Sequence, residues 1–455
     1  MLDRLRQFEG RLGYRTIMDA VIEDISQRVF LPGQKLPPQR HLAHELGVAV
    51  ATVGRAYAEL ETQGFINSHI GRGTFVSERQ HTLGTPDSAT QDVIGLDTYR
   101  VPVPSMNDAI RKVLQAIVTD QAPDRILGGA PAAGLPVHRA AMAEWLAKAA
   151  GIRVSPDQIV LTNGGQHAAM AALSTITHQG QTIATEALTD PRMKAVASYL
   201  DRRLLGIECD AHGPLPDALD HLCRTQDISA VYCTTRNQNP TNITLSLERR
   251  IALVEVARKF DLPIIESDIY GTICTDTVPA IFTLAPERTH FISSLGRIAG
   301  PGMKVGCLVS PLTEVARTQL GVAMSTGAAT LIATEIAARL ILSGQIEAMT
   351  EWQRAENFRR VALFNAHSLL SAAITSPTSP HVWLTLPEPW RAEDFVETAA
   401  RHGVLIAPTH TFVVGRQSIP HAVRLVLGAA PSFGHLEIAC QKLDALLATQ
   451  PRPSI

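Results

Sequence analysis

Residues 36–76 read LPPQRHLAHELGVAVATVGRAYAELETQGFINSHIGRGTFV and contain two helical patterns on either side of a glycine. Pro38 stands where the first turn of a helix tolerates proline, and Gly47 stands where a helix ends. A second apolar face begins near Ala49 and stops at Gly64. Two short helices around such a turn predict a helix-turn-helix, whose second helix can enter the major groove of DNA.

Two short strand-like runs follow the second helix, at residues 65–68 and 74–76, around the turn Gly71-Arg72-Gly73. They predict a hairpin wing with a cation at its tip, which suits contact with phosphate or a minor groove. A small helical domain without a nucleic-acid partner shares the helix spacing, so geometry alone leaves both interpretations open.

The segments PGQKLPPQRHLA, LGVAVATVGRAYAELETQGFI and GRGTFV resemble the winged DNA-binding domain of GntR-type regulators. That family usually carries a polar residue and an arginine where this chain has the apolar Ala49 and Val50. Each remaining polar residue at this face can read a base edge or bind only phosphate. The resemblance implies that the following residues contact a DNA operator: Arg40, Thr52, Arg55 and Arg72.

The totals describe an ordinary globular protein of 455 residues, 45% hydrophobic and 18% charged, which suggests two or three domains. The six cysteines form no CxxC pair and no metal-ligand spacing, so we expect reduced thiols and no metal site. No apolar run reaches membrane-spanning length, and residues 1–10 are charged rather than signal-like. We therefore expect a cytoplasmic protein with no membrane partner.

The net charge of the chain contributes little to DNA binding. The net charge is −2, and residues 1–80 carry ten Lys and Arg against nine Asp and Glu. Affinity for DNA must come from the local placement of a few arginines and from doubling of the site in a dimer.

The chain order suggests three parts. Residues 15–28 form the first helix of the predicted winged helix-turn-helix, which covers residues 1–78. The polar run SERQHTLGTPDSATQD then begins a linker, taken as residues 79–104. The second domain covers residues 105–455.

Six short apolar runs alternate with helical patterns in the second domain: QIVLTN, QTIATE, AVYCTT, LPIIESD, HFISSLG and VGCLV. This alternation predicts an α/β fold with a mainly parallel sheet and helices on both faces. From about residue 330 a long helix leads into a smaller C-terminal α+β subdomain, at residues 330–455. In such sheets ligands gather at the carboxyl ends of the strands.

The ends of these strands resemble the fold-type I aminotransferases, and the whole chain resembles the MocR-type regulators, in which such a domain follows a GntR-type wing. The motifs are TNGGQHAAM, IIESDIYG and NPT. The resemblance implies a site for pyridoxal phosphate (PLP), with backbone N–H groups at the phosphate and a carboxylate at the ring nitrogen. The residues in question are Gly165 and Gln166 for the phosphate, Asp268 for the ring nitrogen, Asn239 and Tyr270 for the ring oxygen, and Arg424 for a substrate carboxylate.

The sequence departs from the family motif at the positions of the catalytic lysine and the phosphate-binding arginine. The family reads S-x-S-K and then P-G-x-R-x-G, whereas this chain has Ser294-Leu295-Gly296-Arg297 and then Lys304 in place of the phosphate-binding arginine. Arg297 stands at the Schiff-base lysine and stays protonated, so it cannot act as an amine nucleophile. The stacking aromatic is also missing, since Asp190 aligns loosely with its position.

Three interpretations remain. The first, which we prefer, is a transcription regulator whose second domain senses a small ligand without catalysis. That ligand is non-covalent PLP, a PLP–amino acid adduct, an amino acid or another small anion. The second is a PLP-dependent aminotransferase with an attached DNA-binding domain, and the third is a scaffold dimer without a ligand. In the first we expect a homodimer, and Arg297 is a candidate partner for Asp268 when no cofactor is bound.

Overall fold

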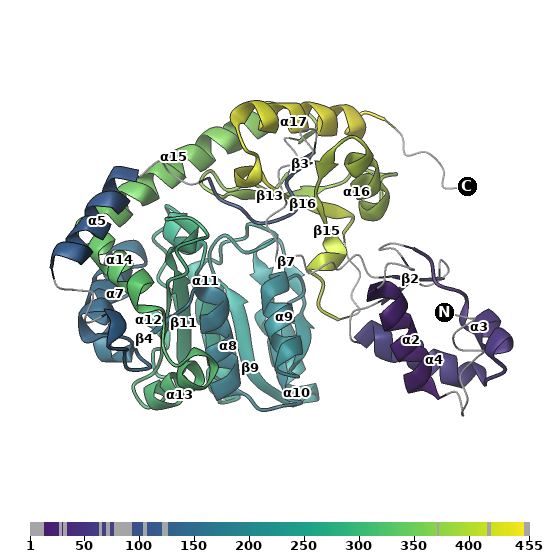
Figure 1. Cartoon of the computed structure of the whole chain (residues 1–455), viewed down its shortest axis with the longest axis horizontal. Coiled ribbons are helices and arrows are strands. Elements are labelled where there is room, and N and C mark those ends of the chain that lie inside the picture. Colours follow the sequence, from purple (N-terminus) through teal and green to yellow (C-terminus); the bar gives the residue numbers. More distant parts are fainter. Residues whose placement is uncertain are drawn as a thin grey trace. The chain divides into compact units, whose positions relative to one another are not determined.

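The computed structural model describes residues 13–26, 30, 34–62, 66–69, 73–76, 93–102, 107–120, 126–370, 373–415 and 420–449. The chain divides into two compact units, residues 1–91 and residues 92–455 (Figure 1). In the described part, no helix is both long and apolar enough to cross a lipid bilayer.

The first unit is a winged helix-turn-helix, as predicted. Its elements are α2 (Tyr14–Ser26), α3 (Gln39–Leu46), α4 (Val50–Thr62), β1 (Ile66–His69) and β2 (Gly73–Val76). Gly47 ends α3 with a φ of 65°, a left-handed conformation that glycine adopts without strain. Strands β1 and β2 pair antiparallel and form the wing. Of the predicted wing turn Gly71-Arg72-Gly73, Gly73 begins β2, and Gly71 and Arg72 lie outside the described residues.

One apolar cluster holds the three helices and the wing together. The apolar residues recur at helical spacing, so one face of each helix points inward. The buried members are Ile17, Ala20, Val21, Leu36, Leu42, Ala43, Leu46, Val53, Ala56, Tyr57, Leu60, Ile66 and Val76. Tyr57 also donates a 2.9 Å hydrogen bond to the carbonyl of Pro37, which ties α4 to the chain before α3.

The second unit is built on a seven-stranded sheet of order β4-β12-β11-β10-β9-β5-β6. Its strands are β4 (Ile159–Thr162), β5 (Thr182–Glu186), β6 (Arg203–Ile207), β9 (Ile228–Thr234), β10 (Ile264–Ser267), β11 (Thr289–Ser294) and β12 (Gly306–Val309). Strand β12 runs antiparallel to both of its neighbours, and the other pairs are parallel. The carboxyl ends of six strands therefore share one edge, as the predicted α/β fold requires.

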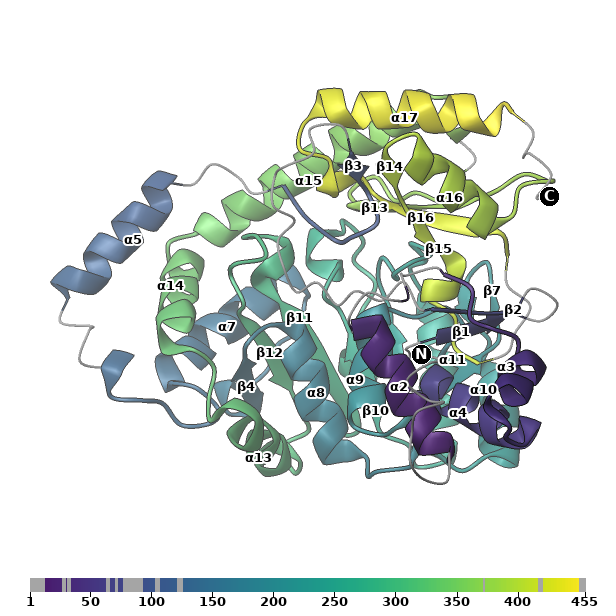
Figure 2. The ribbon, with the colours of Figure 1, turned by 45° about the vertical axis from the view of Figure 1, so that its right-hand side comes forward.

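Helices cover both faces of this sheet (Figures 1 and 2). One face packs against α8 (Gly165–Ile176), α9 (Pro191–Tyr199) and α13 (Val315–Thr326). The other face packs against α7 (Pro136–Ala149), α10 (Pro216–Thr225), α11 (Leu247–Lys259), α12 (Ile281–Leu284) and α14 (Leu331–Leu342). Helix α5 (Asn107–Thr119) lies beside α14. Burial on both faces explains why the strands read as continuous apolar runs.

The smaller subdomain begins after the long helix α15 (Gln345–Asn365). Its antiparallel sheet has the order β13-β16-β15, under α16 (Ala392–Arg401) and α17 (Phe433–Leu447) (Figure 2). The strands of this sheet are β13 (His381–Thr385), β15 (Ala407–Pro408) and β16 (Ala422–Val426). Strand β14 (Val404–Leu405) belongs to the same subdomain but lies outside this sheet. A further hairpin, β7 (Cys209–Asp210) with β8 (Gly213–Pro214), follows β6.

The second unit begins earlier along the chain than the predicted start at residue 105. Strand β3 (Ile94–Gly95) pairs in parallel with β14 of the smaller subdomain. Tyr99 and Val101 are buried against Tyr270 and Val426. Residues 93–102 are therefore part of the second unit's packing rather than of a linker. The two-residue strand is too short to show a period in the sequence.

Candidate functional site

The first unit presents its predicted DNA-contacting residues on α3 and α4. Arg40 and Arg55 are exposed, and Thr52 is half-buried. The Arg55 guanidinium carbon lies 4.3 Å from the ring centroid of Tyr14 on α2, so a cation–π contact orients this side chain on α4. Arg72 lies outside the described residues, so its predicted place at the wing tip stays a prediction.

The second unit gathers polar side chains at the carboxyl edge of its large sheet. Asn239 lies at the centre of this group. Its Nδ2 donates to Asp190 Oδ2 at 2.8 Å and to the hydroxyl of Tyr270 at 3.4 Å. Its Oδ1 accepts a 3.1 Å hydrogen bond from Arg424 Nη1. Arg297 Nη2 donates to the same Tyr270 hydroxyl at 3.4 Å, so the structure brings these predicted site residues together.

Arg297 is held by aromatic rings rather than by a carboxylate. Its guanidinium carbon lies 3.5 Å from the ring centroid of Tyr99 and 5.1 Å from that of Tyr270. The residue is 7% exposed. A guanidinium over aromatic faces gains cation–π energy but keeps its full charge.

Arg424 lies on β16 of the smaller subdomain and is buried, at 5% exposure. Besides Asn239 it donates through Nη2 to the backbone carbonyl of Asp97, and its guanidinium lies 4.9 Å from the Phe412 ring centroid. Burial lowers the pKa of this guanidinium. Its Nε is buried and has no hydrogen-bond partner among the described residues, which leaves one donor free for a ligand.

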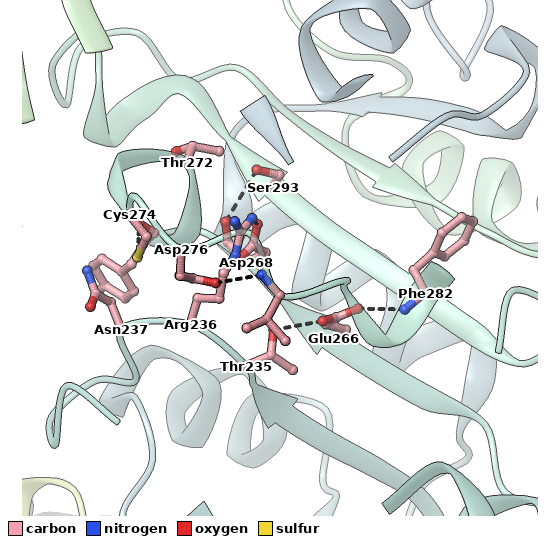
Figure 3. Close-up of polar contacts among 12 residues, drawn as sticks. Thr235, Arg236, Asn237, Glu266, Asp268, Thr272, Cys274, Asp276, Phe282 and Ser293 are labelled. Carbon is pink, nitrogen blue, oxygen red and sulfur yellow. Dashed lines mark hydrogen bonds and ion pairs between the residues drawn. The ribbon is translucent and has the colours of Figure 1, made fainter. Parts of the chain in front are cut away.

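Asp268 does not meet Arg297, the partner that the sequence suggested. Its two carboxylate oxygens accept from Nε and Nη2 of Arg236, the former at 2.9 Å (Figure 3). The two side chains are 1% and 5% exposed. Burial lowers the pKa of Arg236, but the Asp268 carboxylate outweighs burial and raises this pKa above its ordinary value.

The predicted phosphate turn has the shape of an anion site. Helix α8 begins at Gly165 after Gly164, whose φ is 84° and which has no side chain to cap the first N–H groups. A Cβ on Gly165 would lie 2.6 Å from Ile269 Cδ1, so the backbone approaches that side chain closely. Gln166 is exposed at the start of the helix. A helix start of this kind attracts anions by its free N–H groups and its dipole.

Two further residues of the predicted cofactor site, Ser294 and Lys304, lie beside this turn. Ser294 donates a 3.1 Å hydrogen bond to the carbonyl of Val305 and accepts one from the backbone N–H of Gly296. Its hydroxyl is therefore already satisfied. The backbone of Lys304 faces Gly164, 3.9 Å from where a Cβ would stand there, and the Lys304 side chain is exposed.

Asp190 occupies the place that aligned loosely with a stacking aromatic. It caps α9 by accepting from the backbone N–H of Arg192 at 2.8 Å. Burial raises the pKa of Asp190, but Arg192 and the hydrogen bond from Asn239 outweigh burial and hold the pKa below its ordinary value. An ionised carboxylate here offers no flat apolar surface for an aromatic ligand.

These residues do not fit PLP in the orientation that the family resemblance implies. The phosphate turn is suited to an anion, but both oxygens of Asp268 are taken by Arg236. A Cβ on Gly271 would lie 1.8 Å from Asp268 Oδ1 and 2.4 Å from Arg236 Nε, so the Gly271 backbone packs directly against the pair. With Arg297 in place of an amine, neither the ring nitrogen nor the aldehyde of PLP has its usual counterpart.

The comparisons with known proteins agree with this architecture. Residues 13–76 match the family described as bacterial regulatory proteins, gntR family, and residues 91–443 match aminotransferase class I and II. The transcriptional regulator YdeF of Bacillus subtilis is 28% identical over 441 residues, covering 95% of this chain and 94% of its own. The regulator TauR of Rhodobacter capsulatus is 24% identical over 441 residues, covering 89% and 90%.

An archaeal alanine:glyoxylate aminotransferase has the same fold as the second unit. Its TM-score is 0.71 at 23% identity, over 88% of this chain and 95% of its own. The fold and the site thus define a DNA-binding transcription regulator with a fused aminotransferase-like domain. The chain belongs to the aminotransferase class I and II family and, with its gntR-family first unit, is a MocR-type regulator.

Sequence reasoning missed two residues of the site. Arg236 lies two residues after the end of β9, and a charged residue straight after the apolar run AVYCTT was the available signal. Tyr99 comes from the segment taken as a linker, and no local pattern connects it to residues near 297.

Proposed function

We propose that the second unit of this regulator senses a small carboxylate-bearing ligand and performs no chemistry on it. The observation that carries the proposal is the buried guanidinium of Arg297 at the position of the family's Schiff-base lysine. A guanidinium stays protonated at physiological pH, so it can hold a carboxylate but cannot attack a carbonyl or shuttle a proton.

The charge balance of the site supports an anionic ligand. Arg297 and Arg424 are both buried, and in the described part of the chain neither has an acidic side chain within 4.0 Å. The Asp190 carboxylate interacts electrostatically with both guanidiniums from a longer distance. Buried cations are normally paired, so two guanidiniums without a close carboxylate favour a ligand that supplies one.

The charge balance of the site also discriminates among the predicted effectors. An amino acid or another small carboxylate supplies what Arg297 and Arg424 lack. A structure of the same fold, the kynurenine aminotransferase of Pyrococcus horikoshii at TM-score 0.70, is a complex with PMP, but here Arg236 engages both oxygens of Asp268, which disfavours PLP, held non-covalently or as an adduct. The enzyme alternative rests on the same fold, and the scaffold alternative would leave two buried cations with no carboxylate closer than Asp190.

The regulator is proposed to act as a homodimer whose two wings bind paired half-sites of an operator. Support comes from apolar side chains that the second unit leaves exposed: Leu114 and Val118 on α5, and Leu127. Leu127 is 85% exposed and Val118 is 75% exposed. An operator-binding protein acts where the bacterial chromosome lies, in the cytoplasm.

Thermal unfolding of the full-length protein tests the ligand class. The probes are L-glutamate, 2-oxoglutarate, succinate and inorganic phosphate, each against sodium chloride at equal ionic strength. We expect at least one carboxylate to raise the melting temperature of the wild type but not of Arg424→Ala. Arg401→Ala, which alters an exposed arginine on α16, is the matched control. Equal shifts in all three proteins, or none in the wild type, would exclude this site as the sensor.

A further inference from the structure

The pair between Arg236 and Asp268 lies where the family places the ring of its cofactor. Nε and Nη2 of Arg236 contact the two oxygens of Asp268, so one guanidinium engages both oxygens and balances the carboxylate charge (Figure 3). The backbone N–H of Asp268 donates to the carbonyl of Ile292 at 2.8 Å, which fixes the residue against β11. The pair is buried and charge-balanced without any ligand.

The chain on either side of Arg236 holds the guanidinium in place. Thr235 Oγ1 donates a 2.7 Å hydrogen bond to Glu266 on β10 (Figure 3). Arg250 Nη2 donates to the carbonyl of Thr235 at 3.1 Å. Glu266 in turn accepts from the backbone N–H groups of Ile281 and Phe282. Both strand ends that carry the pair are therefore fixed to the core, and the guanidinium is not a mobile surface group.

We infer that Arg236 determines ligand specificity by replacing the cofactor's ring cation and so excluding PLP. A protonated pyridine ring needs the same carboxylate oxygens that Arg236 already holds. Placing two cations on one buried carboxylate leaves an unmatched buried charge, which is strongly unfavourable. The effector is therefore an anion without a cationic ring, and this part of the inference rests on the proposed function.

Titration of the full-length protein with PLP tests this inference, with equilibrium dialysis and visible absorbance as readouts. The wild type and Arg236→Lys, which keeps a cation beside Asp268, should retain no PLP after dialysis. Arg236→Ser leaves the carboxylate free, and PLP should bind it on the order of 100-fold more tightly than the wild type. Adding Asp268→Asn to Arg236→Ser should remove the gain, since a neutral amide needs no counter-cation.

Three results would overturn the role of Arg236. They are stoichiometric retention of PLP by the wild type, equal affinity of wild type and folded Arg236→Ser, and a gain that survives Asp268→Asn. If Arg236→Ser does not fold alone, Arg236→Gln, which keeps a hydrogen bond to Asp268, takes its place in the same comparison. The wild-type dialysis remains decisive in either case.

Failure of the proposed function would look different. Wild-type protein that excludes PLP but responds to no carboxylate would refute the ligand class and leave the role of Arg236 intact. Wild-type protein that binds PLP and changes its DNA affinity would refute the exclusion while keeping a ligand-responsive regulator.

Discussion

The guanidinium of Arg297 lies 3.5 Å from the ring centroid of Tyr99, a residue that enters the site from the beginning of the second unit. Tyr270, which follows the carboxyl end of β10, lies beside the same guanidinium. The ring centroids of Tyr99 and Tyr270 are 5.1 Å apart. An arginine that replaces the Schiff-base lysine is thus packed as a fixed cation among aromatic rings. This packing suits recognition of an anion and does not suit nucleophilic chemistry.

The ring of Tyr99 should contribute to the stability of the fold, and its hydroxyl should contribute only to ligand binding. The hydroxyl is buried and has no hydrogen-bond partner among the described residues. Removal of an unsatisfied buried hydroxyl costs nothing, so Tyr99→Phe should match or exceed the wild-type free energy of unfolding by up to about 1 kcal/mol. Tyr99→Ala should lose about 3 kcal/mol or more. Urea denaturation of both variants measures this, and a large loss in Tyr99→Phe would mean that the hydroxyl is bonded.

Restoring a lysine at position 297 should not by itself restore the cofactor site. Arg297→Lys supplies the amine, but Arg236 still holds Asp268. We expect no borohydride-reducible adduct with PLP in Arg297→Lys and a clear adduct in Arg297→Lys combined with Arg236→Ser. Mass spectrometry of the reduced proteins measures the outcome. An adduct on residue 297 in the single variant would show that the Asp268 position does not control cofactor entry.

Glu186 should make stability depend on pH. It is 3% exposed, and burial raises its pKa from 4.5 to about 7. An acid with a raised pKa in the folded state adds stability below pH 4.5 that is lost progressively up to about pH 7. Glu186→Gln lacks this decline, so its unfolding free energy relative to wild type should rise by up to roughly 3 kcal/mol across that window. Glu397→Gln, at an exposed site on α16, is the control, and parallel wild-type and Glu186→Gln curves would contradict the shift.

Arg40 and Arg55 should carry part of the DNA affinity. Both are exposed on the helices of the first unit. Arg40→Ala and Arg55→Ala should each weaken binding, by about 1–3 kcal/mol with relaxed specificity at one base pair if the arginine reads guanine. A phosphate contact would instead weaken all sequences alike and reduce the salt dependence. Fluorescence anisotropy on fragments selected from a random DNA pool separates the two cases, with Arg401→Ala as control. Unchanged binding in both variants would show that this face does not meet DNA.

The dimer should depend on the exposed apolar side chains near α5. Val118→Asp places a charge in the proposed contact and should shift the protein toward monomer at micromolar concentration. Tyr199→Asp is the matched control, because Tyr199 is 77% exposed at the end of α9. Sedimentation velocity measures both. Dissociation by both variants, or a wild type that is already monomeric with full operator affinity, would remove the dimer from the account.

The sequence was informative where local patterns determine structure. Glycine turns and amphipathic spacing identify α3, α4 and the wing, and apolar runs locate the large sheet. Motif positions also bring Asn239, Tyr270 and Arg424 to one site. The partner of Asp268 could not be predicted, because Arg236 lies in the loop after a different strand, β9, and its side-chain direction depends on packing. The role of Tyr99 was hidden for the same reason.

The decisive measurement is the affinity of the full-length protein for a selected operator fragment, with and without the carboxylate that stabilises the protein. We predict that the carboxylate changes this affinity at least about fivefold in the wild type, a typical allosteric coupling. Arg424→Ala should keep the ligand-free affinity and lose the change, because Arg424 lies in the second unit and not in the winged helix-turn-helix. No change in the wild type with any stabilising carboxylate, or the same change in Arg424→Ala, would contradict the claim that this site is the sensor.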